Sequence, residues 1–132
     1  MPAAETVFMF SGQGSQYFQM GRELFEKNET FRDWMIRLDD IPRHVSGKSV
    51  IEVLYSDVYG KGDRFDRTLL THPAIFMVEY SLAETLVEAG VRPDMVLGVS
   101  LGSCGGCGGR FHWVRRRIDR CGATGNGIRK LL

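Results

Sequence analysis

The sequence lacks a long hydrophobic run. No apolar stretch approaches the roughly 18 residues that a membrane-spanning helix needs. The N-terminal residues MPAAETVFMF lack the basic start and cleavable apolar core of a secretion signal. With 132 residues, 43% hydrophobic and 25% charged, the composition is typical of one globular domain or a piece of a larger one. We therefore expect a cytoplasmic protein with no membrane partner.

Cysteine is absent from the first 103 residues, and acidic residues are nearly absent from the last 30. Residues 1–102 carry 10 Lys and Arg against 15 Asp and Glu, whereas residues 103–132 carry 7 against the single Asp119. All three cysteines and seven of the sixteen glycines lie in this C-terminal segment. This change in charge and composition after residue 102 indicates one of two things. The C-terminal segment is either a tail that binds nucleic acid or membrane, or a segment that does not belong to the preceding fold.

The first hundred residues alternate between strand and helix patterns. The continuous apolar run TVFMF (6–10) predicts a buried strand, and a second strand follows Pro93 at Met95 to Leu97. The segment SVIEVLYS (49–56) fits either a strand or a short helix, and 57–68 reads as a loop. Helices are predicted over 16–27, 29–40 and 71–90. This order predicts an α/β fold with parallel strands.

The clearest helix covers residues 71–90. Thr71 is predicted to cap it, Pro73 suits its first turn, and Gly90 suits its C-terminal stop. Apolar residues recur every three to four positions, which predicts one buried stripe. The stripe comprises Ile75, Val78, Leu82 and Leu86.

The second strand runs into Gly98-Val99-Ser100-Leu101-Gly102, the pattern of a nucleophile elbow. The two glycines leave room for a sharp turn that holds the serine hydroxyl above the sheet. The start of the following helix can then stabilise negative charge that develops beside the hydroxyl. The pattern predicts Ser100 as a nucleophile, and a plain strand-to-helix turn is the alternative.

A glycine loop, GQGSQ (12–16), follows the first strand. It is not a dinucleotide fingerprint, because Tyr17 stands where the third glycine would be required. The loop could instead be a simple turn, or it could present backbone N–H groups to an oxyanion beside the elbow.

Three motifs in order, VFMFSGQGSQYFQMGREL, THPAIF and GVSLGS, resemble the acyltransferase family of malonyl-CoA:acyl carrier protein transacylases and polyketide synthase acyltransferase domains. The resemblance covers about residues 5–103. It implies a partial α/β-hydrolase-like acyltransferase core with parallel strands and a nucleophile elbow. It also implies transfer of a malonyl-type group from coenzyme A to an acyl carrier protein through an acyl-serine. No cofactor is expected beyond acyl-coenzyme A as substrate.

The resemblance also assigns residues. Ser100 matches the acylated serine, and Gln13 and Leu101 match the residues whose backbone N–H groups form the oxyanion hole. His72 matches a substrate-pocket position that more often holds glutamine, although a helix-start histidine is the simpler interpretation. The motifs favour the polyketide branch over fatty acid biosynthesis.

Three departures from the family bear on activity. Val99 replaces the histidine that usually precedes the nucleophile, and no arginine matches the one that holds the malonyl carboxylate. The family's histidine base lies well beyond the serine, whereas this sequence ends 32 residues after Ser100. None of His44, His72 and His112 matches that base. We therefore expect these 132 residues to be a truncated, inactive piece, since serine without a base is a poor nucleophile.

Residues 104–132 have two interpretations. Their metal-ligand pattern resembles a zinc knuckle with Trp113 and six arginines available for nucleic acid; its ligands would be Cys104, Cys107, His112 and Cys121. The favoured interpretation is a frameshift, because alanine codons read one nucleotide early yield glycine, cysteine, arginine and serine. We expect residues 1–103 to form the N-terminal part of the acyltransferase large subdomain, followed by an irregular, disordered tail without nucleic acid.

Overall fold

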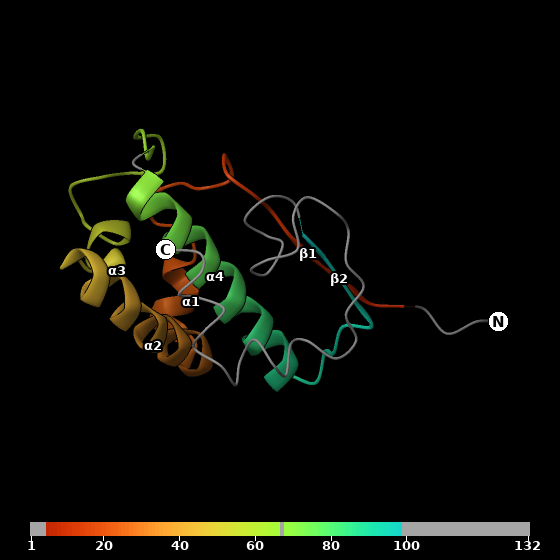
Figure 1. Cartoon of the computed structure of the whole chain (residues 1–132). Coiled ribbons are helices and arrows are strands. Elements are labelled where there is room, and N and C mark those ends of the chain that lie inside the picture. Colours follow the sequence, from red (N-terminus) through yellow and green to blue (C-terminus); the bar gives the residue numbers. More distant parts are fainter. Residues whose placement is uncertain (1–4, 67, 99–132) are drawn as a thin grey trace.

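The computed structural model describes residues 5–66 and 68–98 of the chain (Figure 1). Along the chain, one short strand precedes four helices and a second short strand follows them. In Figure 1 the strands lie to one side of α4, and α1 to α3 lie on its other side. The elements are β1 (Val7–Phe10), α1 (Arg22–Lys27), α2 (Glu29–Ser46), α3 (Val50–Leu54), α4 (Thr68–Glu88) and β2 (Met95–Gly98).

The two strands pair in parallel, as the sequence predicts. Val7 stands opposite Met95 at the start of the ladder, and Phe10 stands opposite Gly98 at its end. One step before the ladder, the Asp94 N–H donates to the Thr6 carbonyl at 2.8 Å, and the Thr6 N–H donates to Asp94 Oδ2 at 2.8 Å. Parallel strands need a long crossover, which the four helices supply. The β-helices-β order of an α/β fold is therefore confirmed.

The core lies between α2 and α4. Phe31, Met35 and Leu38 recur at helical spacing along α2, and all three are buried. At the edge of this core, Trp34 packs edge-on against Tyr80 with 5.3 Å between ring centroids. Together with residues of α3 and the connecting loops, these side chains form one continuous apolar cluster.

The ambiguous segment 49–56 forms a short helix, α3. Ser49 caps it, because its Oγ accepts the Glu52 N–H at 3.1 Å. Asp39, on α2, completes the cap: its Oδ1 accepts the Val50 N–H at 2.7 Å, and its Oδ2 accepts the Ser49 hydroxyl at 2.6 Å. This buried carboxylate therefore joins the end of one helix to the start of the next.

The prediction of a helix over 16–27 is wrong in its first half. The helix begins only at Arg22, because Gln19 (φ 69°) and Gly21 (φ 73°) adopt left-handed backbone conformations that interrupt a right-handed helix. The Gln19 side chain accounts for this conformation, since its Nε2 donates to the carbonyl oxygens of Ser56 and Tyr59. A tertiary contact thus overrides the local helical pattern.

Helix α4 ends as predicted but begins earlier. Gly90 has φ 93° and donates its N–H to Val87 O at 3.0 Å, while Val91 donates to Leu86 O at 2.9 Å. These two bonds form a Schellman motif, which requires the left-handed conformation that glycine adopts readily. Thr71 is not the cap, because the helix starts at Thr68 and Thr71 is buried within it.

The predicted buried stripe of α4 is only half correct. Ile75 is 2% exposed, but Leu82 and Leu86 are 39% and 36% exposed among the described residues. Apolar residues occur on nearly every side of α4, so spacing alone could not identify the face that packs on α2. The residues of α4 that are buried are Leu70, Thr71, Pro73, Ala74, Ile75, Met77, Tyr80 and Ser81.

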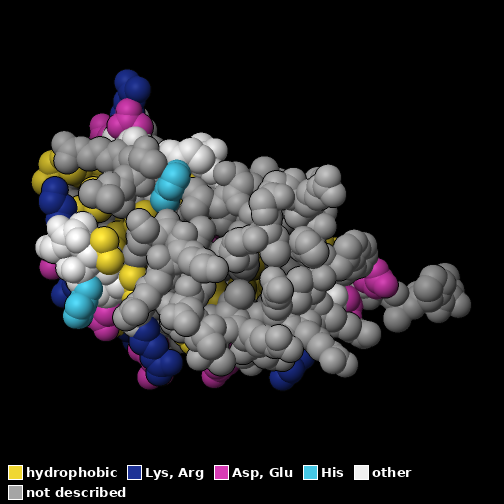
Figure 2. Space-filling model, in the orientation of Figure 1, with side chains coloured by type: hydrophobic (Ala, Val, Ile, Leu, Met, Phe, Trp, Pro, Cys, Tyr) yellow, Lys and Arg dark blue, Asp and Glu magenta, His cyan; other side chains and the backbone are white. Residues whose placement is uncertain are grey.

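Within residues 5–66 and 68–98, none of the helices combines the length and hydrophobicity needed to cross a membrane. On the face shown in Figure 2, basic and acidic side chains of the described residues are interspersed around the rim rather than separated by sign.

Candidate active site

The carboxyl ends of the two parallel strands define the candidate site. Because Phe10 pairs with Gly98, the glycine loop that follows β1 and the segment that follows β2 leave the same edge of the sheet. In open α/β sheets, ligands bind at this edge. Ser100 and Leu101 lie two and three residues beyond Gly98, outside the described residues, and the same is true of Val99 and the whole 104–132 segment.

The glycine loop is a compact turn. Gly14 has φ 107°, a conformation that L side chains rarely adopt, so a glycine is required there. The turn is closed by Ser15, whose Oγ donates to Gly12 O at 2.8 Å and whose N–H donates to the same oxygen at 3.3 Å. Gly14 N–H is satisfied by Gln16 Oε1 at 2.8 Å. The loop therefore has a defined shape built from its own polar groups.

Gln13 lies exposed at the tip of this turn. Its side-chain Nε2 and Oε1 lie 3.4 Å and 3.5 Å from Thr71 Oγ1, so the side chain contacts the first turn of α4. Among the described residues, its backbone N–H has no hydrogen-bond acceptor. An oxyanion-hole donor needs these properties: a fixed position and an N–H left free for substrate.

Glu79 of α4 reaches the base of the same loop. Ser11 Oγ lies 2.6 Å from Glu79 Oε1 and 3.0 Å from Ser15 Oγ. Burial raises the pKa of Glu79, and hydrogen bonds from Ser11 offset part of the rise. Sequence reasoning missed Glu79, although a signal existed. It is the first carboxylate in α4 and follows the apolar run from Pro73 to Val78.

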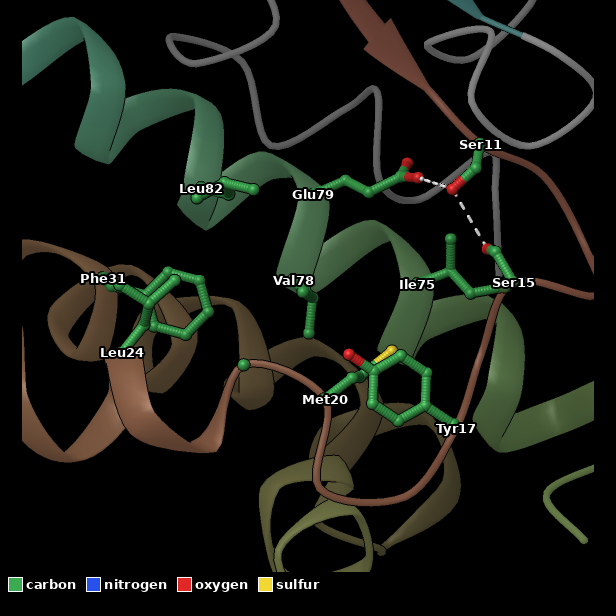
Figure 3. Close-up of a pocket in the computed structure, with 11 residues that line it drawn as sticks. Ser11, Ser15, Tyr17, Met20, Leu24, Phe31, Ile75, Val78, Glu79 and Leu82 are labelled. Atoms are coloured by element: carbon green, nitrogen blue, oxygen red, sulfur yellow. Dashed lines mark hydrogen bonds between the residues drawn. The ribbon is translucent and has the colours of Figure 1, made fainter. Parts of the chain in front are cut away.

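A pocket of about 310 Å³ opens beside this cluster (Figure 3). Ser11, Ser15 and Glu79 form its polar end, and Figure 3 shows their side chains directed toward one another. The remaining lining is mainly apolar and comes from the loop before α1, from α1, α2 and α4: Tyr17, Met20, Gly21, Leu24, Phe31, Ile75, Val78 and Leu82.

His72 lies in α4, away from this pocket. It is half-buried and stands one turn inside the helix. The simpler interpretation, a histidine at the start of the helix, is therefore wrong in its position. The alternative zinc ligands Cys104, Cys107, His112 and Cys121 all lie outside the described residues. In the described part of the chain, no group of three His, Cys, Asp or Glu side chains could hold a metal ion.

Comparison with known proteins identifies the family. The family model of the acyl transferase domain matches residues 7–109. The chain belongs to this family. A polyketide biosynthesis acyltransferase homolog of Bacillus velezensis is 55% identical over 96 residues, which cover 73% of this chain and 30% of that protein. The chain thus spans less than a third of the length of this relative.

Solved structures agree with that assignment. The acyl transferase domain of ZmaA superposes with a TM-score of 0.69 at 31% identity, covering 77% of this chain and 24% of that one. The acyl transferase domain of SpnD, in complex with 2-(pent-4-yn-1-yl)malonyl, gives a TM-score of 0.65 at 34% identity, covering 74% and 22%. The α/β acyltransferase fold and the resemblance to polyketide synthase domains are therefore confirmed.

Proposed function

We propose that this chain is the N-terminal part of an acyltransferase that moves a malonyl-type group from coenzyme A to an acyl carrier protein in polyketide biosynthesis. The observation that carries the proposal is the pairing of Phe10 with Gly98. This pairing starts the Gln13 loop and the Ser100 segment from one edge of the sheet, and the Gln13 N–H has no acceptor among the described residues.

The chemistry is a double displacement at Ser100. The serine oxygen attacks the thioester carbonyl, the C–S bond breaks, and the coenzyme A thiol leaves with the serine proton. The backbone N–H groups of Gln13 and Leu101 would stabilise the oxyanion of each tetrahedral intermediate. The phosphopantetheine thiol of the carrier protein then attacks the acyl-serine and releases Ser100. No cofactor takes part.

The relatives support the substrate class. The Bacillus relative is a polyketide biosynthesis acyltransferase homolog, and the solved SpnD domain holds a substituted malonyl group. Both favour a malonyl-type donor and the polyketide branch. We further propose that residues 1–103 form the N-terminal part of a large subdomain with a nucleophile elbow at Ser100, and that His72 contributes to the substrate pocket.

The histidines present set the reactivity that we propose for these 132 residues. Because none of His44, His72 and His112 matches the family's base, Ser100 should be acylated slowly and should not sustain turnover. The prediction that the chain alone is inactive therefore concerns transfer to the carrier protein. It still allows a single, slow acylation of Ser100, faster as pH rises and more hydroxide is available.

Intact-mass spectrometry tests the proposal. The chain is incubated with malonyl-CoA at pH values from neutral to mildly alkaline, with Ser100→Ala as the matched control. We expect one malonyl adduct per chain, located on Ser100 by peptide mapping, formed faster at higher pH and absent from the variant. The same adduct in Ser100→Ala would refute the assignment of Ser100. Formation of no adduct in the wild type would refute the proposed acylation by these 132 residues and leave the family assignment intact.

A further inference from the structure

The contacts among Glu79, Ser11 and Ser15 join helix α4 to the base of the glycine loop. Three short contacts join the groups in a row: Glu79 Oε1 to Ser11 Oγ at 2.6 Å, Ser11 Oγ to Ser15 Oγ at 3.0 Å, and Ser15 Oγ to Gly12 O at 2.8 Å. Each serine hydroxyl can donate only one hydrogen bond. Two hydroxyl protons therefore fill two of the three contacts as hydrogen bonds: Ser11 donates to Glu79, and Ser15 donates to the Gly12 carbonyl.

Glu79 is therefore the acceptor at one end of this row, and Ser11 is its donor. Ser15 closes the turn through Gly12, and the 3.0 Å approach of its oxygen to Ser11 Oγ places the closed turn against the side chain that Glu79 holds.

Among the described groups, hydrogen bonds from Ser11 are what offset the cost of burying the Glu79 carboxyl. Burial raises the pKa of Glu79, and no neighbouring charge contributes to the shift. The pocket residues that face it from α1 and α2 are the apolar Leu24 and Phe31, and Tyr17 is the only other titratable side chain among the residues that line the pocket. No cation from these elements therefore stabilises a carboxylate.

Helix α4 holds the glycine loop at two points. Thr71 lies against the Gln13 side chain, and Glu79 lies against Ser11 at the base of the loop. Eight residues separate these two anchors, which is about 12 Å along a helix axis. Because both anchors lie on one rigid element, they fix the orientation of the turn as well as its position.

We propose that Glu79, acting through Ser11 and Ser15, is a positioning residue for the glycine turn that presents the Gln13 N–H. This inference rests on the proposed function only for the use of that N–H in oxyanion binding. The hydrogen-bonded chain itself follows from the contacts of Glu79 and stands without it.

Amide hydrogen exchange of the full chain tests the positioning. The Ser15 N–H donates to Gly12 O, so its exchange rate reports whether the turn is closed. We compare Glu79→Gln, Glu79→Ala and Ser11→Ala with Glu88→Gln, an exposed carboxylate at the end of the same helix. Glu79→Ala and Ser11→Ala should speed exchange at Ser15 about tenfold, as expected for loss of one hydrogen bond.

Rescue by the conservative variant separates this role from general stability. A glutamine in place of Glu79 can accept the Ser11 hydroxyl through its amide oxygen, so Glu79→Gln should exchange at the wild-type rate, as should Glu88→Gln. Unchanged exchange of the Ser15 amide in Ser11→Ala and Glu79→Ala would overturn the proposal. Exchange in Glu79→Gln as fast as in Glu79→Ala would also overturn it. If Glu79→Ala does not fold, Ser11→Ala and Glu79→Gln still decide between these outcomes.

The acylation of Ser100 by malonyl-CoA provides a second measurement. The rate constant at saturating malonyl-CoA should fall about tenfold in Glu79→Ala, whereas the half-saturating concentration should not change, because oxyanion donors act on the transition state. A wild-type rate constant in a variant whose loop has opened would overturn the positioning role. A wild-type chain that forms no adduct, yet shows the expected exchange pattern, would instead refute the proposed function alone.

Discussion

The ring of Phe31 occupies the space that a β-carbon on Gly21 would need. A β-carbon built at Gly21 lies 2.9 Å from Phe31 Cζ and 3.4 Å from the Tyr55 hydroxyl oxygen. Gly21 also has φ 73°, directly before α1, and Phe31 is fully buried. A single glycine thus allows the chain to turn into α1 while the helix packs closely on α2.

We expect Gly21→Ala to destabilise the fold by about 2–3 kcal/mol: about 1 kcal/mol for the left-handed backbone and the rest for overpacking against Phe31. Gly47→Ala is the matched control, because Gly47 has φ 71° and nothing lies within 4 Å of the position that a β-carbon would take there. That variant should lose only about 1 kcal/mol. Urea unfolding measures both, and equal losses would show that Phe31 moves aside without cost.

Asp39 should be the most sensitive polar residue of the described fold. Its carboxylate is 2% exposed and accepts hydrogen bonds from Ser49 Oγ, the Val50 and Ile51 N–H groups and Arg43 Nε. Asp39→Ala leaves these donors without their acceptor and should cost about 3 kcal/mol. Asp40→Ala, at the exposed neighbouring position, should cost far less. A loss below about 1 kcal/mol for Asp39→Ala would mean that water replaces the carboxylate.

The sequence predicted the elements with strong local signals. The strand within 6–10, the periodic α2 and the Gly90 stop of α4 each follow from residues close together in the chain. The predicted burial of that strand is wrong, because Phe8 is buried but Val7 and Met9 are 41% and 76% exposed. The candidate loop could be located for the same reason, because GQGSQ directly follows a strand. Gln13 lies at the tip of that loop, where the family resemblance assigns an oxyanion donor.

The remaining features depend on contacts between distant residues. Gln19 leaves the helical conformation because its side chain binds carbonyl groups about 40 residues further on, which no local pattern contains. In the sequence, Glu79 resembles an ordinary carboxylate on a helix surface. Only the fold shows that Ser11, 68 residues earlier, lies beside it. For the same reason the exposure of Leu82 could not be predicted, since the packed face of an all-round apolar helix is chosen by its neighbours.

Removal of zinc should leave this fold unchanged. The described core consists of apolar side chains from the four helices and the connecting segments, with no cysteine or metal cluster among residues 5–66 and 68–98. We expect a chelator to leave the melting temperature unaltered and elemental analysis to find far less than one zinc per chain. Stoichiometric zinc that disappears in Cys104→Ser/Cys107→Ser would instead support the zinc-knuckle alternative.

The stability of the chain should depend on pH through Glu79. Its folded-state pKa is raised above the ordinary value of 4.5, so the folded protein keeps a proton that the unfolded chain has released. Where the folded state binds more protons, stability falls as pH rises. The fall should begin near the unfolded pKa and end once pH has passed the folded pKa.

Glu79→Gln isolates this contribution, because its amide stays neutral at every pH. Other groups change the stability with pH in the opposite direction. The pKa of Glu23, for example, is lowered by its hydrogen bond to Lys27. These groups are the same in the wild type and in Glu79→Gln, so their effects cancel in the comparison. The variant should therefore gain stability relative to the wild type as pH rises from about 4 to about 8, measured by urea unfolding at each pH. A difference between the two proteins that stays constant over this range would show that Glu79 ionises equally well in the folded and unfolded chains.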